Sequence, residues 1–165
     1  MKVIQILAFP FSLLYGMVTR LRNFFYDREI FQSVKFNVPV ICIGNLSLGG
    51  TGKSPHLEYI VELLGAENIA TLSRGYGRKT NGFILVSETS TAEETGDEPL
   101  QFKKKFNKLL VAVCEDRVKG IDELLKINPK LKAILLDDAF QHRKIKPGLS
   151  ILLTDYNKPF YHDVV

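Results

Sequence analysis

The sequence predicts an α/β protein in which helices flank a mostly parallel sheet and an apolar helix precedes it. Five short apolar runs recur between residues 38 and 154, and each is continuous rather than alternating in polarity. Continuous apolar runs are typical of strands that are buried on both faces of a parallel sheet. Segments with apolar residues at helical spacing separate several of these runs, as expected when helices connect parallel strands.

The predicted elements can be placed along the chain in order. A helix is expected over 57–64, where Gly65 ends the apolar pattern, and another over 118–125, shortly before Pro129. A further strand is expected at 82–88, after a glycine-rich turn. The five main strands are expected at 38–44, 69–73, 108–114, 133–137 and 149–154.

Composition narrows the class of protein. A chain of 165 residues with 45% hydrophobic and 24% charged residues suits one soluble core, which we divide into an N-terminal helix over 1–30 and a core over 31–165. The net charge of +4 includes basic runs at 103–105 and 143–146, which are usually solvated surfaces but would also suit a phosphate-rich ligand or an anionic membrane. No recognition motif accompanies them, so nucleic acid is not expected as a partner.

The N-terminal apolar stretch, residues 3–18, is shorter than the ~20 residues that span a bilayer. It lacks the small-residue cleavage pattern of a secretory signal. We expect an interfacial helix, although packing against the domain's own core is the alternative. Lipid-facing side chains would be Phe9, Phe11, Leu13, Leu14, Tyr15, Phe24, Phe25 and Tyr26, with Arg20, Arg22 and Arg28 reaching anionic head groups.

The segment "GNLSLGGTGKSP" at 44–55 follows a predicted strand and opens a predicted helix. It departs from the phosphate-loop pattern because Ser47 stands where the first glycine is expected. The rest of the pattern predicts a P-loop NTPase-like nucleotide site, in which backbone N–H groups surround phosphate, Lys53 reaches the β- and γ-phosphates and Ser54 binds Mg²⁺. The predicted nucleotide-binding residues are Gly49, Gly50, Thr51, Gly52, Lys53 and Ser54.

Two aspartates follow a buried run at 133–137, where ligands of open α/β sheets bind. Asp137 and Asp138 are therefore predicted to hold Mg²⁺ or its water shell, with a helix cap or turn as the alternative. Guanine is disfavoured as the base, because "NKPF" has Phe160 where a guanine-reading motif needs aspartate. The two cysteines, Cys42 and Cys114, lie in apolar runs without metal-ligand spacing and are expected to be buried thiols.

The motifs "GNLSLGGTGKSP", "LSRGYGRK", "GDEP" and "LDDAFQHR", in this order, resemble the tetraacyldisaccharide 4'-kinases of lipid A biosynthesis. The resemblance covers essentially the whole chain, and that family also uses Ser or Thr at the position of Ser47. It implies transfer of the γ-phosphoryl group of ATP, with Mg²⁺, to the 4'-hydroxyl of a tetraacylated glucosamine disaccharide 1-phosphate. It further implies a peripheral or monotopic protein at the cytoplasmic side of the inner membrane, and no obligate protein partner is implied.

Further site residues are expected on this basis. By resemblance Asp97 of "GDEP" is the catalytic carboxylate, with an N-terminal helix cap as the alternative because the segment reads as an acidic helix start. Glu98 is expected only to support the helix end. His142 is a candidate catalytic residue that could also be structural. Candidate substrate-binding residues are Arg74, Tyr76, Arg117 and Gln141. For the segment with Arg74 and Tyr76 a plain hairpin turn is the alternative, and for Arg117 a surface salt bridge with Glu115 or Asp116.

The resemblance also implies members longer than this chain, with a second lobe that closes over the nucleotide. We therefore expect adenine contacts from that lobe to be absent and phosphoryl transfer by this chain to be weak, because closure completes many such sites. Two alternatives from other classes remain open. One is a membrane-associated P-loop ATPase switch, and the other is a non-catalytic nucleotide-binding fragment.

Overall fold

The computed structural model describes residues 2–45 and 52–154. It divides into two compact units, Met1–Val34 and Lys35–Val165, and each is described by itself. Gly49, Gly50 and Thr51 of the predicted phosphate loop lie outside the described residues, as does Phe160. The side chains of residues 2–14 also lie outside, and with them the predicted lipid contacts of Phe9, Phe11, Leu13 and Leu14.

The first unit is helix α1, Lys2–Asp27, which extends well past the apolar stretch seen in the sequence. The chain folds back at the end of this helix, where the N–H of Ile30 donates to the carbonyl of Phe25 at 2.9 Å. Phe31 then places its ring edge-on against Phe25 and Tyr26, with centroids 5.2 and 5.3 Å apart. Within the described part of the chain, no helix has the length and apolarity needed to cross a membrane.

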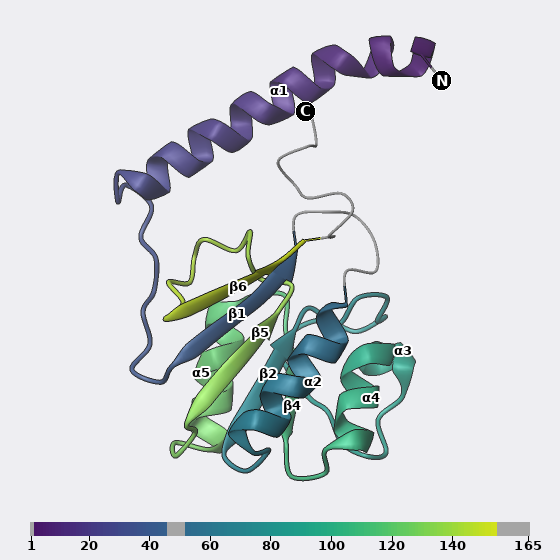
Figure 1. Cartoon of the computed structure of the whole chain (residues 1–165), viewed down its shortest axis with the longest axis vertical. Coiled ribbons are helices and arrows are strands. Elements are labelled where there is room, and N and C mark those ends of the chain that lie inside the picture. The colour runs from purple at the N-terminus through teal and green to yellow at the C-terminus, as the bar shows by residue number, and fades with distance from the viewer. Residues whose placement is uncertain (1, 46–51, 155–165) are drawn as a thin grey trace. The chain divides into compact units, whose positions relative to one another are not determined.

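The second unit contains a six-stranded sheet in the order β3-β4-β2-β5-β1-β6 (Figure 1). All strand pairs are parallel except β3 with β4, which confirms the predicted mostly parallel sheet. The strand expected at 82–88 is only two residues long. A turn follows it, in which the N–H of Ser87 donates to the hydroxyl oxygen of Ser90. The strands are β1 Val40–Asn45, β2 Ile69–Ser73, β3 Ile84–Leu85, β4 Leu110–Val113, β5 Ala133–Asp137 and β6 Leu149–Leu153.

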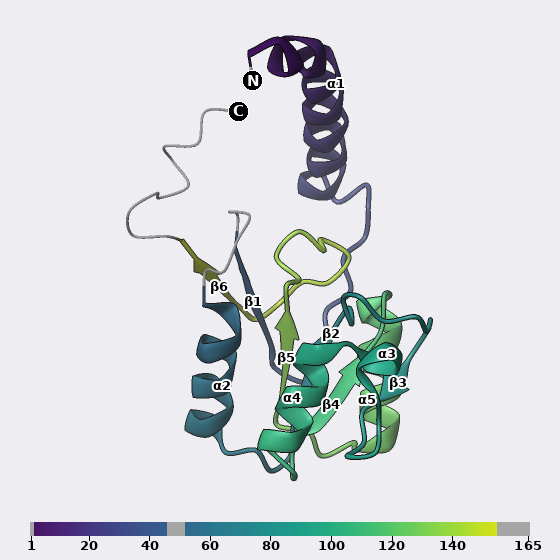
Figure 2. The ribbon, with the colours of Figure 1, turned by 90° about the vertical axis from the view of Figure 1, so that its right-hand side faces the viewer.

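Helices cover both faces of the sheet, with α5 on one face and α2 and α4 on the other (Figure 2). Their bounds are α2 Lys53–Leu64, α3 Ala92–Thr95, α4 Asp97–Lys105 and α5 Arg117–Ile127. The two predicted helices correspond to α2 and α5, each starting earlier than the apolar pattern alone showed.

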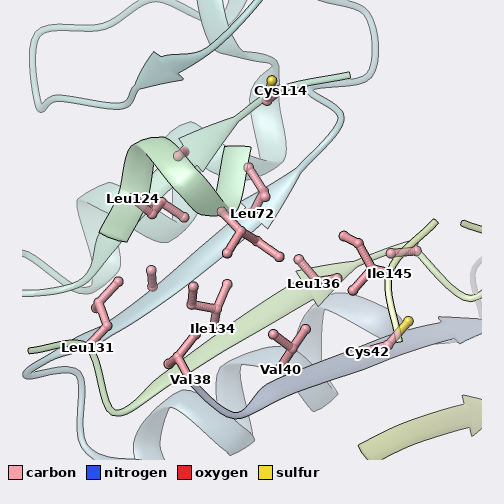
Figure 3. Packing of buried hydrophobic residues seen from close by; sticks show 14 residues of the cluster. Val38, Val40, Cys42, Leu72, Cys114, Leu124, Leu131, Ile134, Leu136 and Ile145 are labelled. Carbon is pink, nitrogen blue, oxygen red and sulfur yellow. The ribbon is translucent and has the colours of Figure 1, made fainter. Parts of the chain in front are cut away.

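The apolar runs are continuous because successive side chains of each strand enter different cores. Cys42, Leu72 and Leu136 pack with Leu124 of α5 on one face (Figure 3). Ile43 and Leu135 turn to the opposite face, where α2 and α4 supply a second cluster with Leu57, Val61 and Phe102. Both predicted buried thiols, Cys42 and Cys114, are confirmed, and desolvation raises the pKa of Cys42 to about 11.

The parallel strands bring the site segments to one edge of the sheet, because their carboxyl ends all point the same way. Strand β1 pairs with β5 so that Ile43 lies opposite Asp137. The turn after β5 then approaches β1 closely: a Cβ on Gly44 would lie only 2.7 Å from the Cβ of Phe140. Glycine at this position therefore allows the post-β5 turn to lie against the end of β1.

Candidate active site

Lys53 connects the ends of two neighbouring strands. It is the first residue of α2, and its Nζ donates to Asn45 Oδ1 at 3.0 Å and to Asp138 Oδ1 at 2.9 Å. The preceding Gly52 has φ +79°, a left-handed conformation that favours glycine. The lysine ammonium is thereby held at the carboxyl edge of β1 and β5, where a phosphate-loop lysine is needed.

Ser54 contacts Glu98, a residue for which the sequence predicted no role at the phosphate site. Its hydroxyl donates to Glu98 Oε1, a carboxylate on the second residue of α4. Glu98 was expected only to support the helix end, and that expectation is too narrow because its side chain reaches the phosphate-loop helix. A hydroxyl and a carboxylate side by side are oxygen groups of the kind that Mg²⁺ and its water shell prefer.

Asp137 is a buried carboxylate without a full set of partners. Its residue is 6% exposed, and Oδ1 has no hydrogen-bond partner among the described residues. Burial raises the pKa of this carboxyl to about 7, aided by the negative charges of Glu98 and Asp138 and opposed by Lys53 and Arg117. A buried oxygen that lacks a partner fits a cation or a cation-bound water at this position.

The donor set fits Mg²⁺ in the manner usual for phosphate-bound magnesium. The described residues contain no cluster of three His, Cys, Asp or Glu side chains that would hold a metal by themselves. Magnesium is commonly held by one or two carboxylates together with substrate phosphates and water. Asp137, Asp138, Glu98 and Ser54 would supply these few protein groups.

Asp138 occupies a strained turn and not a helix cap. Its φ is +50°, and its N–H donates to the carbonyl of Ile43 at 2.9 Å. Because no helix follows β5 directly, the helix-cap alternative for the two aspartates is wrong, and Asp138 lies in a turn. A non-glycine residue in this conformation costs on the order of 1 kcal/mol, and such positions are often found at functional sites.

Asp97 is the first residue of α4 and its side chain is exposed. The helix start predicted for "GDEP" is therefore confirmed, but the cap alternative for Asp97 is wrong because Asp97 lies inside the helix. Gly96 takes the cap position with φ +89° and no side-chain cap bond, so acidic charge in the first turn is favourable mainly through the helix dipole. The next residue, Glu98, contacts Ser54. Asp97 therefore lies one position before the residue that connects α4 to the phosphate-loop serine.

Arg117 is buried, not on the surface. It is 3% exposed, and its Nη1 donates to the carbonyl of Cys114 at 2.6 Å. Desolvation lowers the pKa of this guanidinium, while the charge of Asp137 opposes that effect. The expected alternative of a surface salt bridge is wrong, because Glu115 pairs with Arg78 and Asp116 caps α5 by accepting from the N–H of Val118.

Arg74 and Tyr76 follow β2 at the same edge of the sheet. Both are exposed, and Tyr76 is 96% exposed. The charge of Arg74 also lowers the pKa of Arg117, which indicates that the two guanidinium groups share one electrostatic environment. Two cations at a sheet edge that ends in carboxylates can receive a phosphorylated acceptor.

A pocket of about 240 Å³ adjoins Arg117 on the side of the post-β5 segment. His142 lies in its wall, and its N–H donates to the carbonyl of Ala139 at 2.9 Å. Gln141 is exposed on the same turn. The pocket is lined by Glu115, Asp116, Arg117, Val118, His142, Lys144 and Ile145.

A strand, a glycine and a helix that begins with Lys53 and Ser54, with carboxylates at the end of the neighbouring parallel strand, have the arrangement typical of P-loop-type nucleotide sites. Residues 4–165 match the family described as "Tetraacyldisaccharide-1-P 4'-kinase", and the chain belongs to this family.

Curated relatives carry the same description. The chain is 54% identical to the tetraacyldisaccharide 4'-kinase of Flavobacterium psychrophilum over 99% of its own length and 48% of the relative's. It is 52% identical to that of Bacteroides thetaiotaomicron over 95% of its length and 42% of the relative's. The chain thus spans about half the length of the curated relatives that it matches.

A solved structure agrees with the fold. LpxK from Aquifex aeolicus, crystallised in complex with ATP, superposes with a TM-score of 0.81 at 40% sequence identity. The match covers 90% of this chain and 48% of that one. The parallel sheet and its covering helices are therefore those of this family.

Proposed function

We propose that this chain supplies the nucleotide site and the catalytic carboxylate of a lipid kinase, and that these suffice for slow transfer. The reaction is transfer of the γ-phosphoryl group of ATP to the 4'-hydroxyl of a tetraacylated glucosamine disaccharide 1-phosphate. The observation that carries the proposal is the position of Lys53, which bridges β1 and the post-β5 turn beside the Ser54–Glu98 pair. Family membership and the ATP complex of the similar structure support it.

The nucleotide phosphates would replace Asp138 as the ion-pair partner of the Lys53 ammonium. An exposed carboxylate such as Asp138 is a weak partner for it, since exposed ion pairs contribute about 0–1 kcal/mol, so phosphate can displace it. Asp137, Asp138, Glu98 and Ser54 would hold Mg²⁺, which when bound neutralises charge on the β- and γ-phosphates. Asp138, once released from Lys53, is then available to this set.

The acceptor hydroxyl needs a group that removes its proton. Asp97 lies exposed at the start of α4, next to Glu98, and would accept the proton as the 4'-oxygen bonds to the γ-phosphorus. The bond from that phosphorus to the β-bridging oxygen breaks, and ADP leaves. Arg74 and Tyr76, both exposed, would contact the acceptor's sugar and phosphate. The buried Arg117 would act from the pocket wall together with His142, and the exposed Gln141 would contact the acceptor from the same turn as His142.

The first unit suits a membrane surface, and we include membrane contact in the proposal. On α1, Met17, Val18, Leu21 and Phe24 are between 47% and 63% exposed and recur at helical spacing. The guanidinium of Arg28 stacks over the Phe24 ring at 5.2 Å, at the junction of apolar and charged surface. Such a helix would lie in the interface of the cytoplasmic side of the inner membrane, where the acyl chains of the acceptor are anchored.

The test is whether ADP release depends on the lipid. Purified chain with Mg²⁺ and ATP is assayed with and without the tetraacyldisaccharide 1-phosphate in mixed micelles, and with matched micelles that lack it. The proposal predicts ADP release that rises with the disaccharide and is lost in Lys53→Ala. ADP release that ignores the disaccharide would support an ATPase switch instead, and nucleotide binding without any turnover would support a non-catalytic fragment.

A further inference from the structure

The buried guanidinium of Arg78 joins two segments that are far apart in sequence. Its side chain is 3% exposed, and its Nη2 donates to the carbonyl of Gly82 at 2.8 Å and to Glu115 Oε1. Glu115 Oε2 in turn accepts from the N–H of Gly82 at 3.0 Å. The guanidinium, the carboxylate and the backbone N–H and carbonyl of Gly82 thereby close a ring that fastens the segment after β2 to the turn between β4 and α5.

The same segment wraps around the Arg78 side chain and contacts the start of α4. A Cβ on Gly75 would lie 2.6 Å from Arg78 Cδ and 3.0 Å from the carbonyl oxygen of Thr95. A Cβ on Gly96 would lie 2.9 Å from the carbonyl oxygen of Tyr76. The chain between Gly75 and Arg78 therefore packs directly against the peptide that precedes Asp97.

Three proposed site segments are connected through the segment that contains Arg78. Arg74 and Tyr76 lie in that segment, Asp97 follows the contact at Gly96, and Arg117 follows Glu115 by two residues. Arg74 and Tyr76 follow β2, whereas Asp97 begins α4 and Arg117 begins α5. Arg78 and Glu115 form the ion pair that connects the segments.

We propose that Arg78, through Glu115, is a positioning residue that holds Arg74, Tyr76 and Asp97 in the arrangement needed to receive the acceptor. The inference rests on the proposed function, because it assigns these side chains to the acceptor. It involves no contact between Arg78 and the nucleotide. Lys53 and Ser54 are held by Asn45, Asp138 and Glu98.

An arginine is suited to this task for a physical reason. A planar guanidinium donates in several fixed directions at once, whereas a lysine ammonium is a single point charge. Burial alone would raise the pKa of Glu115, but hydrogen bonds from its own backbone, Gly82 and Arg78 hold that pKa below its ordinary value. The carboxylate therefore stays charged and keeps the guanidinium in place.

The test compares Arg78→Ala and Glu115→Gln with a control in the same segment. Lys79→Ala is matched, because Lys79 pairs with Glu93 at 2.9 Å on the surface, with side chains 72% and 70% exposed. Kinetics are measured by varying the lipid disaccharide and ATP separately. Arg78→Ala is expected to raise KM for the disaccharide and lower kcat, each on the order of tenfold, since small displacements of positioned groups are costly. KM for Mg²⁺·ATP in Arg78→Ala should change less than KM for the disaccharide, and the Lys79→Ala kinetics should stay within about twofold of the unmodified chain.

Backbone hydrogen exchange provides a second readout that does not need kinase activity. Faster exchange confined to residues 74–82 and 95–98 in Arg78→Ala, absent in Lys79→Ala, supports the positioning role. Unchanged exchange there overturns it, and so does a fall in kcat that follows the folded fraction while KM for the disaccharide stays constant. If Arg78→Ala does not fold, Arg78→Lys and Glu115→Gln are used with the same criteria. Failure of the unmodified chain to phosphorylate the lipid would overturn the proposed function, whereas the exchange data would still decide the positioning claim.

Discussion

The Nζ of Lys53 lies 2.9 Å from Asp138 Oδ1, and these residues are 85 positions apart in the chain. The contact joins the start of α2, which follows β1, to the turn after β5. Strands β1 and β5 pair in parallel. It places a cation and the Asp137–Asp138 carboxylates at one point on the sheet edge. A site for phosphate and Mg²⁺ needs both kinds of charge at this spacing.

Asn45 should matter for nucleotide binding although no motif names it. Its side-chain oxygen orients the Lys53 ammonium at 3.0 Å, and a hydrogen bond to a charged group contributes about 1.5–3 kcal/mol. Asn45→Ala is expected to weaken Mg²⁺·ATP binding by roughly tenfold, measured by calorimetry. Glu67→Gln, on an exposed ion pair with Lys108, is the control. Unchanged or tighter binding by Asn45→Ala would show that Lys53 does not need this partner.

Glu98→Gln should reveal the magnesium role of that carboxylate. The amide keeps an acceptor for the Ser54 hydroxyl but removes the charge beside it. The Mg²⁺ concentration that gives half-maximal turnover is expected to rise on the order of tenfold, because one of few anionic groups is lost. Glu93→Gln, exposed near the same helix start, should not change it. An unaltered Mg²⁺ requirement would limit Glu98 to supporting the helix.

Asp137 should make stability depend on pH. Its pKa is raised from 3.8 to about 7 in the folded chain, mainly by burial. Below the ordinary pKa the carboxyl is protonated in both states, so the folded state carries no penalty. As pH rises from about 4 to about 7, the unfolded chain releases this proton while the folded chain keeps it, so the free energy of unfolding falls by about 1.4 kcal/mol per pH unit and levels off above about 7.

Urea denaturation between pH 5 and pH 8, with chelator and without nucleotide, measures this effect. Asp137→Asn should lose the part of the decline that Asp137 causes and become more stable relative to the unmodified chain as pH rises. Parallel stability curves for the two proteins would mean that the carboxyl ionises normally in the folded state.

Gly96→Ala tests the contact between the Tyr76 segment and the start of α4. The substitution combines φ +89° with a Cβ placed 2.9 Å from the carbonyl oxygen of Tyr76, and should cost about 2–4 kcal/mol of unfolding free energy. Gly77→Ala isolates the conformational part, because Gly77 has φ +78° and open space around it. Equal losses in the two variants would show that the segment yields easily at Gly96.

The sequence predicted the elements that depend on local pattern. The parallel strands, α2 and α5 follow from apolar spacing, and Lys53, Asp137 and Asp138 from motif position at strand ends. Helix α3, Ala92–Thr95, was missed, although Thr91 and Glu94 form a capping box that is legible as Thr-x-x-Glu.

Contacts between distant segments could not be predicted in the same way. Asn45, Glu98 and Arg78 gain their roles from partners 8, 44 and 37 positions away, which no local pattern specifies. The burial of Arg117 was not predicted, because charged residues are seldom fully buried; the Cys114 carbonyl and the charge of Asp137 make its burial tolerable.

Phosphoryl transfer to the lipid is the most direct test of the proposed function. Chain incubated with γ-labelled ATP, Mg²⁺ and tetraacyldisaccharide 1-phosphate in mixed micelles is compared with Lys53→Ala and Asp97→Asn, and the lipid is isolated and counted. We expect labelled lipid to appear slowly with the unmodified chain and to be absent with both substitutions. Labelled lipid that persists in Asp97→Asn would contradict the role of that carboxylate. No label in any sample, with Mg²⁺·ATP binding intact in the unmodified chain, would contradict the claim that these residues suffice for transfer.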